Sequence, residues 1–259
     1  MKIKFYKYQG TGNDFIIVQD RDGSNETLLK NRIEQLCNRR FGIGADGFIF
    51  IQDYAGYDFY MRYYNSDGKV SSMCGNGGRC VISLANKLGT SGKKLEFMAA
   101  DGPHSGYIDQ EIINLKMANV GDYRKIGADY VLGTGSPHYV RFVENFNDVD
   151  IVLEGKKVRY SSKFREDGIN VNFVEITNGE IKVATYERGV EGETLSCGTG
   201  VTAAALASKL NFPDKFNNSI NVISKGGNLV VKFEYNGNIF KNVWLSGPAV
   251  NTFVGEINI

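Results

Sequence analysis

The order of apolar and polar residues along the first half of the chain predicts short strands, glycine-rich turns and two helices. Between the first two strands, Gly10-Thr11-Gly12 predicts a tight turn. Apolar residues recur at helical spacing over residues 26–40 and 76–88. The predicted strands are residues 3–10, 14–20, 48–52, 57–68, 94–100, 106–110 and 111–118.

The second half of the chain repeats this mixture of strand and helix patterns. Helices are predicted over residues 151–164 and 198–210, and the second is rich in alanine. The sequence KGGN at residues 225–228 predicts a hairpin turn. The predicted strands are residues 130–145, with a glycine-rich interruption, and residues 169–176, 180–189, 221–235 and 240–259.

One arrangement occurs twice: an alternating strand, then a cysteine in a glycine-rich bend, then a helix. Cys74 is in the first copy (SSMCGNGGRC) and Cys197 is in the second (LSCGTGVTAA), close to half a chain length away. We infer an ancient duplication that produced two pseudo-symmetric α+β domains. Each is expected to be a curved, mostly antiparallel sheet packed around a central helix.

Composition narrows the classes of function. The formal net charge is +1, from 30 basic and 29 acidic residues, so we expect neither a nucleic-acid partner nor a membrane surface partner. No stretch has the pattern of a membrane span or a secretory signal. The four cysteines are too scattered for a metal site or a disulfide framework, which predicts a cytoplasmic protein without a bound metal.

A cysteine at the start of a helix has distinctive chemistry. The unpaired N–H groups and the positive dipole of the first turn stabilise a thiolate, so the pKa of such a cysteine can fall from about 8.5 to roughly 3.5–7.5. The same N–H groups bind carboxylates or phosphates. We expect Gly75, Gly77 and Gly78 to let the backbone approach a ligand closely and adopt positive φ.

Several reactions could use such a thiol. A Cys/His hydrolase would need His104 or His138 as its base, and neither lies in a known signature. A redox pair of Cys74 and Cys197 is possible, whereas the Gly-Lys-[Ser/Thr] of a Walker loop is missing. Two opposed thiols also suit racemisation, in which one removes a proton and the other returns one to the opposite face of the carbon. Cys37 and Cys80 are interpreted as core residues on apolar helix faces.

Three motifs in order, GTGNDF, YYNSDG with MCGNGGRC, and YERGVEGETLSCGTG, resemble the diaminopimelate epimerase family. The resemblance implies a pyridoxal-phosphate-independent and cofactor-free epimerase. It would interconvert LL- and meso-2,6-diaminopimelate in the biosynthesis of lysine and peptidoglycan precursors. It also implies a homodimer, and two domains that comprise residues 1–118 with a returning strand at about 249–259, and residues 119–248.

The resemblance further implies roles for particular residues, with Cys74 and Cys197 as alternating base and acid. Ser136 and His138 are candidates that line the site, although the family commonly has asparagine at the serine position. Some members have glutamine where this chain has Gly47, and the YERGVEGET loop is one residue longer than usual. The implied substrate-binding residues are Asn13, Asn65, Gly75, Asn76, Asn170, Glu187, Arg188, Gly198 and Thr199.

Two other functions remain open on the sequence. One is a related racemase of the proline or hydroxyproline type, which would not need Arg188 and Asn170 at a distal amino-acid end. The other is a non-catalytic amino-acid-binding relative that has kept the fold. The asparagines could also be turn formers, and Asp46 is interpreted as a loop residue rather than a ligand.

Overall fold

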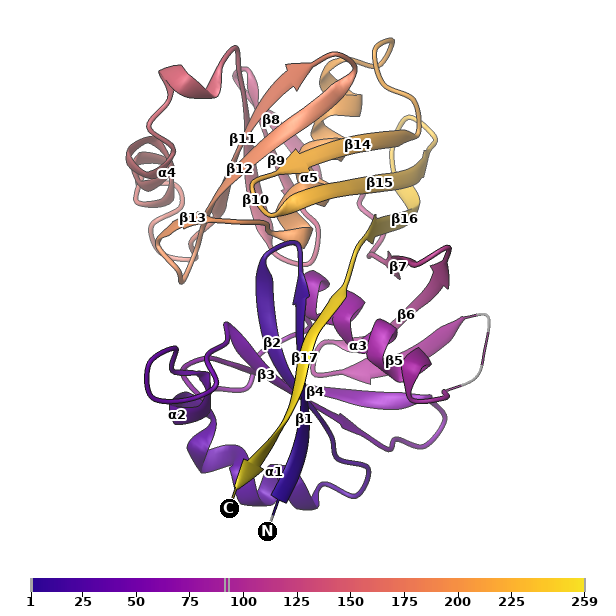
Figure 1. Cartoon of the computed structure of the whole chain (residues 1–259). Coiled ribbons are helices and arrows are strands. Elements are labelled where there is room, and N and C mark those ends of the chain that lie inside the picture. The colour runs from indigo at the N-terminus through magenta and orange to yellow at the C-terminus, as the bar shows by residue number, and fades with distance from the viewer. Residues whose placement is uncertain (1, 91, 93, 259) are drawn as a thin grey trace. The chain divides into compact units, whose positions relative to one another are not determined.

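A computed structural model describes residues 2–90, 92 and 94–258 of the chain. The chain folds into two compact units. Unit 1 consists of Met1–Leu115 together with Gly247–Ile259, and unit 2 consists of Lys116–Ser246. Figure 1 shows that the C-terminal strand lies beside the N-terminal strand, so both ends of the chain belong to unit 1. The prediction of an α+β fold is confirmed.

Unit 1 is a mixed sheet around one long helix, α3 (Gly75–Lys87), with smaller helices at one side. Strand pairing runs from the edge pair β17–β1 through antiparallel β1–β2, parallel β2–β3, antiparallel β3–β4 and parallel β4–β5 to antiparallel β5–β6 and β6–β7. The strands are β1 (Lys2–Gly10), β2 (Asn13–Gln19), β3 (Gly47–Gln52), β4 (Phe59–Asn65), β5 (Leu95–Ala99), β6 (Gly102–Asp109), β7 (Ile112–Lys116) and β17 (Val250–Asn258).

Unit 2 has the same plan around α5 (Gly198–Asn211), with α4 (Ile151–Arg159) and the short 3₁₀ helix η2 (Phe146–Asp148) outside the sheet. Pairing runs through β8–β9, β9–β10, parallel β10–β11, β11–β12, parallel β12–β14, β14–β15 and β15–β16. The strands are β8 (Tyr123–Ile126), β9 (Asp129–Gly133), β10 (Pro137–Val143), β11 (Asn170–Thr177), β12 (Glu180–Glu187), β13 (Gly192–Thr194), β14 (Ser219–Ser224), β15 (Gly227–Tyr235) and β16 (Phe240–Gly247).

The two units share one order of pairings, which is the pattern that a duplication predicts. In each unit an antiparallel pair leads to a parallel pair, a second antiparallel pair, a second parallel pair and a final antiparallel meander. The long helix follows the fourth strand of this order, β4 in unit 1 and β12 in unit 2, and the short β13 precedes it in unit 2. Equivalent positions therefore place Cys74 and Cys197 at equivalent helix starts.

Both long helices are buried because their residues are small or apolar on the sides that meet the sheets. In α5 the alanines at 203, 204, 205 and 207 are fully buried, as is Leu206. In α3, Cys80, Val81, Ile82 and Leu84 are fully buried, so the prediction that Cys80 is a core residue is confirmed. Burial of this apolar surface is the main contribution that holds each helix on its sheet.

The structure corrects the predicted helix over residues 26–40. It is broken into α1 (Ser24–Leu29), the 3₁₀ helix η1 (Lys30–Arg32) and α2 (Ile33–Cys37). It ends at Cys37 because the Asn38 side-chain oxygen accepts hydrogen bonds from the N–H groups of Arg40 and Phe41, both at 2.9 Å. Such an asparagine turn competes with helical hydrogen bonding.

Other differences from the sequence prediction concern the extent of elements. The glycine-rich interruption in residues 130–145 separates two strands, β9 and β10, and the helix predicted to reach residue 164 ends at Arg159. The short strands β8 and β13 were not predicted, since neither has four alternating residues between turn signals. No helix in the part of the chain that the structure describes is long and apolar enough to cross a membrane.

Candidate active site

Each unit places its cysteine at the N-cap of its long helix. Cys74 and Cys197 both have extended backbone geometry, with φ and ψ of −96° and 129° and of −116° and 112°. The first helical hydrogen bonds run from Gly78 N to Cys74 O at 2.7 Å and from Val201 N to Cys197 O at 2.8 Å. Both cysteines therefore directly precede the first turn of a helix, where backbone N–H groups can bind an anion.

The glycines after Cys74 do not have the predicted positive φ. Gly75, Gly77 and Gly78 belong to α3, and none of them has positive φ. A Cβ atom on Gly77 would lie 3.1 Å from Met61 Cε, and one on Gly78 would lie 3.1 Å from Leu115 Cδ2. An added Cβ atom at either position would require these side chains to move by a few tenths of an ångström, so the helix start packs closely on the sheet.

In unit 1 the structure brings Asn13 and Asn76 together beside Cys74. Asn13 is the first residue of β2, and its side-chain oxygen accepts a hydrogen bond from Asn76 Nδ2 at 3.3 Å. The same oxygen lies 3.6 Å from Cys74 Sγ, which donates to it. Asn76 is 1% exposed, so this group is sheltered from water.

A cluster of charged side chains binds the amide nitrogen of Asn13. Asp46 accepts from Asn13 Nδ2 at 2.7 Å and also pairs with Arg39 at 2.7 Å. Asp14 pairs with Arg39 at 2.6 Å and with Lys7 at 2.7 Å. Burial alone would raise the pKa of Asp14, but hydrogen bonds from Arg39 and Lys7 lower it well below its usual range.

Asn65 ends β4 and is exposed, and its backbone closes the following turn through Asn65 N to Lys69 O at 2.9 Å. Asn65 is opposite Gly47 in the β3–β4 pair. A Cβ atom on Gly47 would lie 2.5 Å from Tyr63 Cε2. In this chain the tyrosine ring thus occupies the space that a glutamine at position 47 would need.

In unit 2 the structure buries His138 completely and holds it neutral. Burial and the positive charge of Arg188 together lower the pKa of His138 to about 3. Asn172 Nδ2 donates to Tyr139 O at 3.1 Å, so its nitrogen, not its oxygen, faces His138 Nδ1 at 3.0 Å. The imidazole therefore accepts at Nδ1 and carries its proton on Nε2.

The Nε2–H group of His138 points to the helix start that carries Cys197. It lies 2.9 Å from both Ser136 Oγ and Thr199 Oγ1. Thr199 Oγ1 in turn lies 3.4 Å from Cys197 Sγ. Asn170 Nδ2 donates to Ser136 Oγ at 3.0 Å, so Ser136 fills a place in this network although it is shorter than asparagine.

Arg188 and Glu187 follow directly on this network at the end of β12. The backbone N–H of Arg188 donates to Asn170 Oδ1 at 2.8 Å, and its exposed guanidinium donates to Asp167 O at 2.7 Å. In the following loop, Glu191 has a φ of 56° and accepts from Tyr186 Oη at 2.8 Å.

The predicted site residues thus form two groups, one in each unit. Cys74, Gly75, Asn76 and Asn13 lie together in unit 1, with Asn65 at the exposed end of a strand. In unit 2 the residues that lie together are Cys197, Gly198, Thr199, Ser136, His138, Asn170 and Arg188, with Glu187 adjacent in sequence.

Most of the chain, including Cys74 and Cys197, matches a known protein family. The family model described as diaminopimelate epimerase matches residues 5–118 and 130–250. The chain belongs to the diaminopimelate epimerase family. It is therefore an isomerase, as the sequence predicted.

Relatives with this family name match almost the whole chain. The diaminopimelate epimerase of Flavobacterium psychrophilum is 48% identical over 99% of this chain and 100% of its own length. That of Aquifex aeolicus is 35% identical over 99% of this chain and 98% of its own length. That of Chlorobaculum tepidum is 37% identical over 96% of this chain and 99% of its own length.

Solved structures of low sequence identity share the fold. A phenazine biosynthesis protein of the PhzF family from Bacillus anthracis has a TM-score of 0.77 at 14% identity, with complete coverage of both chains. A hydroxyproline epimerase from Agrobacterium vitis has a TM-score of 0.69 at 12% identity, covering 99% of this chain and 92% of its own. The diaminopimelate epimerase family thus shares its architecture with proteins of other names.

The structure adds residues to the candidate site of this family member that the sequence did not indicate. Asp46, interpreted as a loop residue, binds Asn13, and Arg79 binds Asn76 at 3.0 Å. In unit 2, Asn172 fixes His138, and Thr185 Oγ1 donates to Asn172 Oδ1 at 2.9 Å. The partners of Asp46, Asn172 and Thr185 are distant in sequence or lie across strands, so no local pattern could reveal them. Arg79 and Asn76 are three residues apart on α3, but helical spacing does not distinguish this pair from other polar neighbours.

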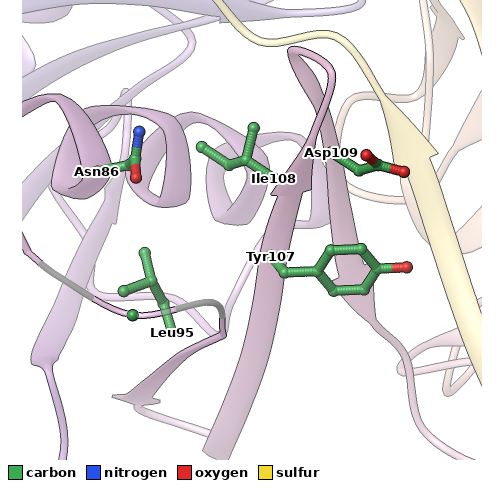
Figure 2. Close-up of a pocket in the computed structure, with 6 residues that line it drawn as sticks. Asn86, Leu95, Tyr107, Ile108 and Asp109 are labelled. Carbon is green, nitrogen blue, oxygen red and sulfur yellow. The ribbon is translucent and has the colours of Figure 1, made fainter.

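The other two cysteines are buried core residues. Burial raises the pKa of Cys37 to about 12, and it also raises the pKa of Cys80. A pocket of about 310 Å³ in unit 1 is lined by none of the predicted site residues (Figure 2). The lining residues of this pocket are Asn86, Gly92, Leu95, Tyr107, Ile108 and Asp109.

Within the described residues, no group of three or more His, Cys, Asp or Glu side chains is placed to hold a metal ion.

Proposed function

We propose that this chain interconverts LL- and meso-2,6-diaminopimelate by exchange of one α proton between two thiols, without a cofactor. The observation that carries the proposal is that each unit holds a cysteine at the N-cap of its long helix, in a chain whose named relatives are diaminopimelate epimerases. One thiolate removes the α proton and becomes a thiol. The other thiol gives its proton to the opposite face and becomes a thiolate, so the pair exchanges protonation states at each turnover.

The helix starts would stabilise the carbanion that this exchange creates. As the α proton leaves, negative charge spreads into the neighbouring carboxylate. Backbone N–H groups after each cysteine, from Gly75, Asn76, Gly198 and Thr199, are suited to bind that carboxylate. Because these donors are fixed by the helices before substrate arrives, little reorganisation is needed during the reaction.

The remaining residues would recognise the second amino-acid centre of the substrate. The Arg188 guanidinium is a bidentate donor that suits the distal carboxylate. The side-chain oxygens of Asn65 and Asn170 suit its ammonium group. Glu187 would bind the ammonium group at the reacting carbon, and Asn13 would contact the substrate beside Cys74. Ser136 and His138 would line the site.

The decisive test is incubation with LL-diaminopimelate in heavy water. We expect deuterium at the α carbon together with the meso product, detected by NMR and chiral chromatography. Cys74→Ala and Cys197→Ala should each lower epimerisation by at least about 1,000-fold, since each removes one of two obligatory proton carriers. Cys37→Ala, at a buried thiol outside the site, is the control that should retain activity.

Near-normal turnover by Cys197→Ala would contradict the two-thiol mechanism. L-proline and hydroxyproline serve as competing substrates in the same assay, because structures named as a probable proline racemase and a hydroxyproline epimerase share the fold. Preference for proline would favour the racemase alternative, and binding without deuterium exchange would favour a non-catalytic amino-acid-binding protein.

We further propose that the enzyme acts as a cytoplasmic homodimer that supplies lysine and peptidoglycan precursors. The resemblance to the family supports the dimer and the pathway, and the scattered cysteines together with the lack of a secretory-signal pattern support the cytoplasm. Light scattering of the purified protein checks the dimer, and growth of a strain that lacks its own epimerase checks the pathway role. Failure to restore growth without supplied meso-diaminopimelate would contradict that role.

A further inference from the structure

Two amide side chains beside Cys74 have orientations fixed from both ends. Asn13 Nδ2 donates to Asp46 Oδ2 at 2.7 Å, so its Oδ1 must face the opposite direction, where Asn76 Nδ2 and Cys74 Sγ lie at 3.3 and 3.6 Å. Rotation of the Asn13 amide by 180° would place its oxygen against the Asp46 carboxylate and its nitrogen against the nitrogen of Asn76. Both contacts would be unfavourable.

Arg79 fixes the second amide. Its Nη2 donates to Asn76 Oδ1 at 3.0 Å, and Thr11 Oγ1 lies 3.4 Å from the same oxygen. Asn76 must therefore direct its nitrogen to Asn13. The hydrogen bonds run in one direction, from Arg79 through Asn76 and Asn13 to Asp46.

The two residues at the ends of this series of hydrogen bonds, Arg79 and Asp46, have opposite charges and different partners. Arg79 is completely buried, and it donates to neutral oxygens: Thr11 Oγ1 at 3.0 Å, Gly75 O at 3.3 Å and Pro248 O at 3.4 Å. Asp46 is partly exposed and is held by Arg39 at 2.7 Å. A cation and a carboxylate at opposite ends polarise both amides in the same sense.

We propose that Asp46 and Arg79 are positioning residues that make Asn13 present its carbonyl oxygen, and not its amide N–H, to Cys74. The inference rests on the proposed function only in giving Cys74 a part in the reaction. An acceptor that faces sulfur favours the protonated thiol, whereas an N–H group would favour the thiolate. Asp46 and Arg79 thereby influence which protonation state Cys74 adopts before substrate binds.

Nearby charges also influence the protonation state of Cys74. The test must distinguish their effect from the effect of the Asn13 amide orientation. The Arg79 charge favours the thiolate, and the acidic side chains oppose it. The Asp101 carboxylate accepts from Met73 N at 3.0 Å, directly before Cys74. Among the described residues, the charged or titratable groups from the elements packed around this site include Arg79, Cys80, Lys7, Asp14, Arg39, Asp46, Asp101 and His104.

Two variants of Asp46 separate orientation from charge, because Asp46→Ala and Asp46→Asn remove the same charge and only Asn keeps an acceptor for Asn13 Nδ2. Iodoacetamide alkylation of the free protein is measured from pH 5 to 10 by mass spectrometry of the Cys74 peptide. In Asp46→Ala we expect the midpoint of Cys74 alkylation to fall by about one pH unit, since the released amide can donate to a thiolate. In Asp46→Asn we expect less than half of that shift.

The Cys197 peptide is the internal control, and its alkylation midpoint should not move. Asp53→Ala is the matched control, since it removes another exposed ion-paired carboxylate of unit 1, bound to Arg21 at 2.8 Å, and should leave Cys74 unchanged. Far-UV circular dichroism and a thermal melt establish that each variant is folded. If Asp46→Ala does not fold, Asp46→Leu, which likewise lacks an acceptor for Asn13 Nδ2, is compared with Asp46→Asn for the same ordering of midpoints.

Three results would overturn the proposal. The first is an unchanged alkylation midpoint of Cys74 in Asp46→Ala. The second is an equal shift in Asp46→Ala and Asp46→Asn, which would assign the effect to the lost charge. The third is a parallel shift of the Cys197 midpoint, which would indicate that the whole protein is destabilised. Alkylation reports on the thiol whether or not the protein epimerises diaminopimelate. A failure of this inference is therefore distinguishable from a failure of the proposed function.

Discussion

His138 shows how a single side chain can be held in one chemical form. It lies in a strand, is completely buried, and has its Nδ1 occupied by the Asn172 amide. Burial and the Arg188 charge both disfavour the imidazolium, so the neutral ring donates from Nε2 across the pH range of cells. A fixed neutral donor next to Thr199 and Ser136 is a stable element of the site rather than a proton carrier.

We predict that the His138 ring does not titrate between pH 5 and 8 and that NMR of the ¹⁵N-labelled imidazole shows the proton on Nε2. Since the native pKa of about 3 lies below the ordinary 6.5, the unfolded chain takes up a proton first as the pH falls. Stability should therefore decline below pH 6.5 by up to about 1.4 kcal/mol per pH unit.

His138→Gln should lack this part of the decline, which urea unfolding at several pH values can measure. A ring signal that titrates near pH 6.5 in the folded protein would contradict the assignment.

At the scale of elements, small residues at the starts of α3 and α5 decide how closely the helices pack on their sheets. In α5 a Cβ atom on Gly200 would lie 2.4 Å from Asn172 Oδ1 and 3.2 Å from Thr185 Oγ1. The helix start, the β11 amide and the β12 hydroxyl are therefore in direct contact. Because Asn172 also fixes His138, the packing of α5 and the geometry around Cys197 depend on the same few atoms.

Gly200→Ala should lower the free energy of unfolding by about 1–3 kcal/mol, because the added methyl group must displace Asn172. It should also lower activity, since the displaced amide releases His138. Gly192→Ala is the matched control, because its Cβ atom would meet no atom within 4 Å and its φ is not positive. Equal stability of the two variants in thermal melts would contradict this account of the helix start.

At the scale of the whole molecule, the chain returns to its beginning to complete unit 1. β17 pairs with β1 over most of its length, from Lys2 opposite Asn258 to Gln9 opposite Val250. The charged cluster of Lys7, Asp14 and Arg39 joins β1, β2 and the loop after α2 near the same strands. Unit 1 therefore depends on contacts between segments that are very distant in sequence.

This cluster predicts acid sensitivity of unit 1. The native pKa of Asp14 lies below its ordinary 3.8, so its contribution to stability is complete above about pH 4 and is lost as the pH falls through the native value. Asp14→Asn should be less stable than the parent protein at pH 7, and the difference should shrink below pH 4. Urea unfolding followed by circular dichroism measures this, and a difference that is independent of pH would contradict it.

Much of the fold followed from local sequence patterns, because apolar periodicity and turn residues act over a few positions. Both long helices begin within one residue of their predicted starts, and the KGGN hairpin joins β14 and β15 as expected. By contrast, apolar periodicity did not indicate that the Asn38 side chain ends α2, where it accepts hydrogen bonds from backbone N–H groups that would otherwise continue the helix.

The sequence by itself determined which residues begin the two helices and that a thiol stands at each start, since N-cap position and helical period are local properties. The tertiary structure alone decided the orientations of Asn13, Asn76 and His138, because each depends on partners from other strands or loops. It also decided that Gly77 and Gly78 pack closely on the sheet, because only the folded chain places Met61 and Leu115 against them.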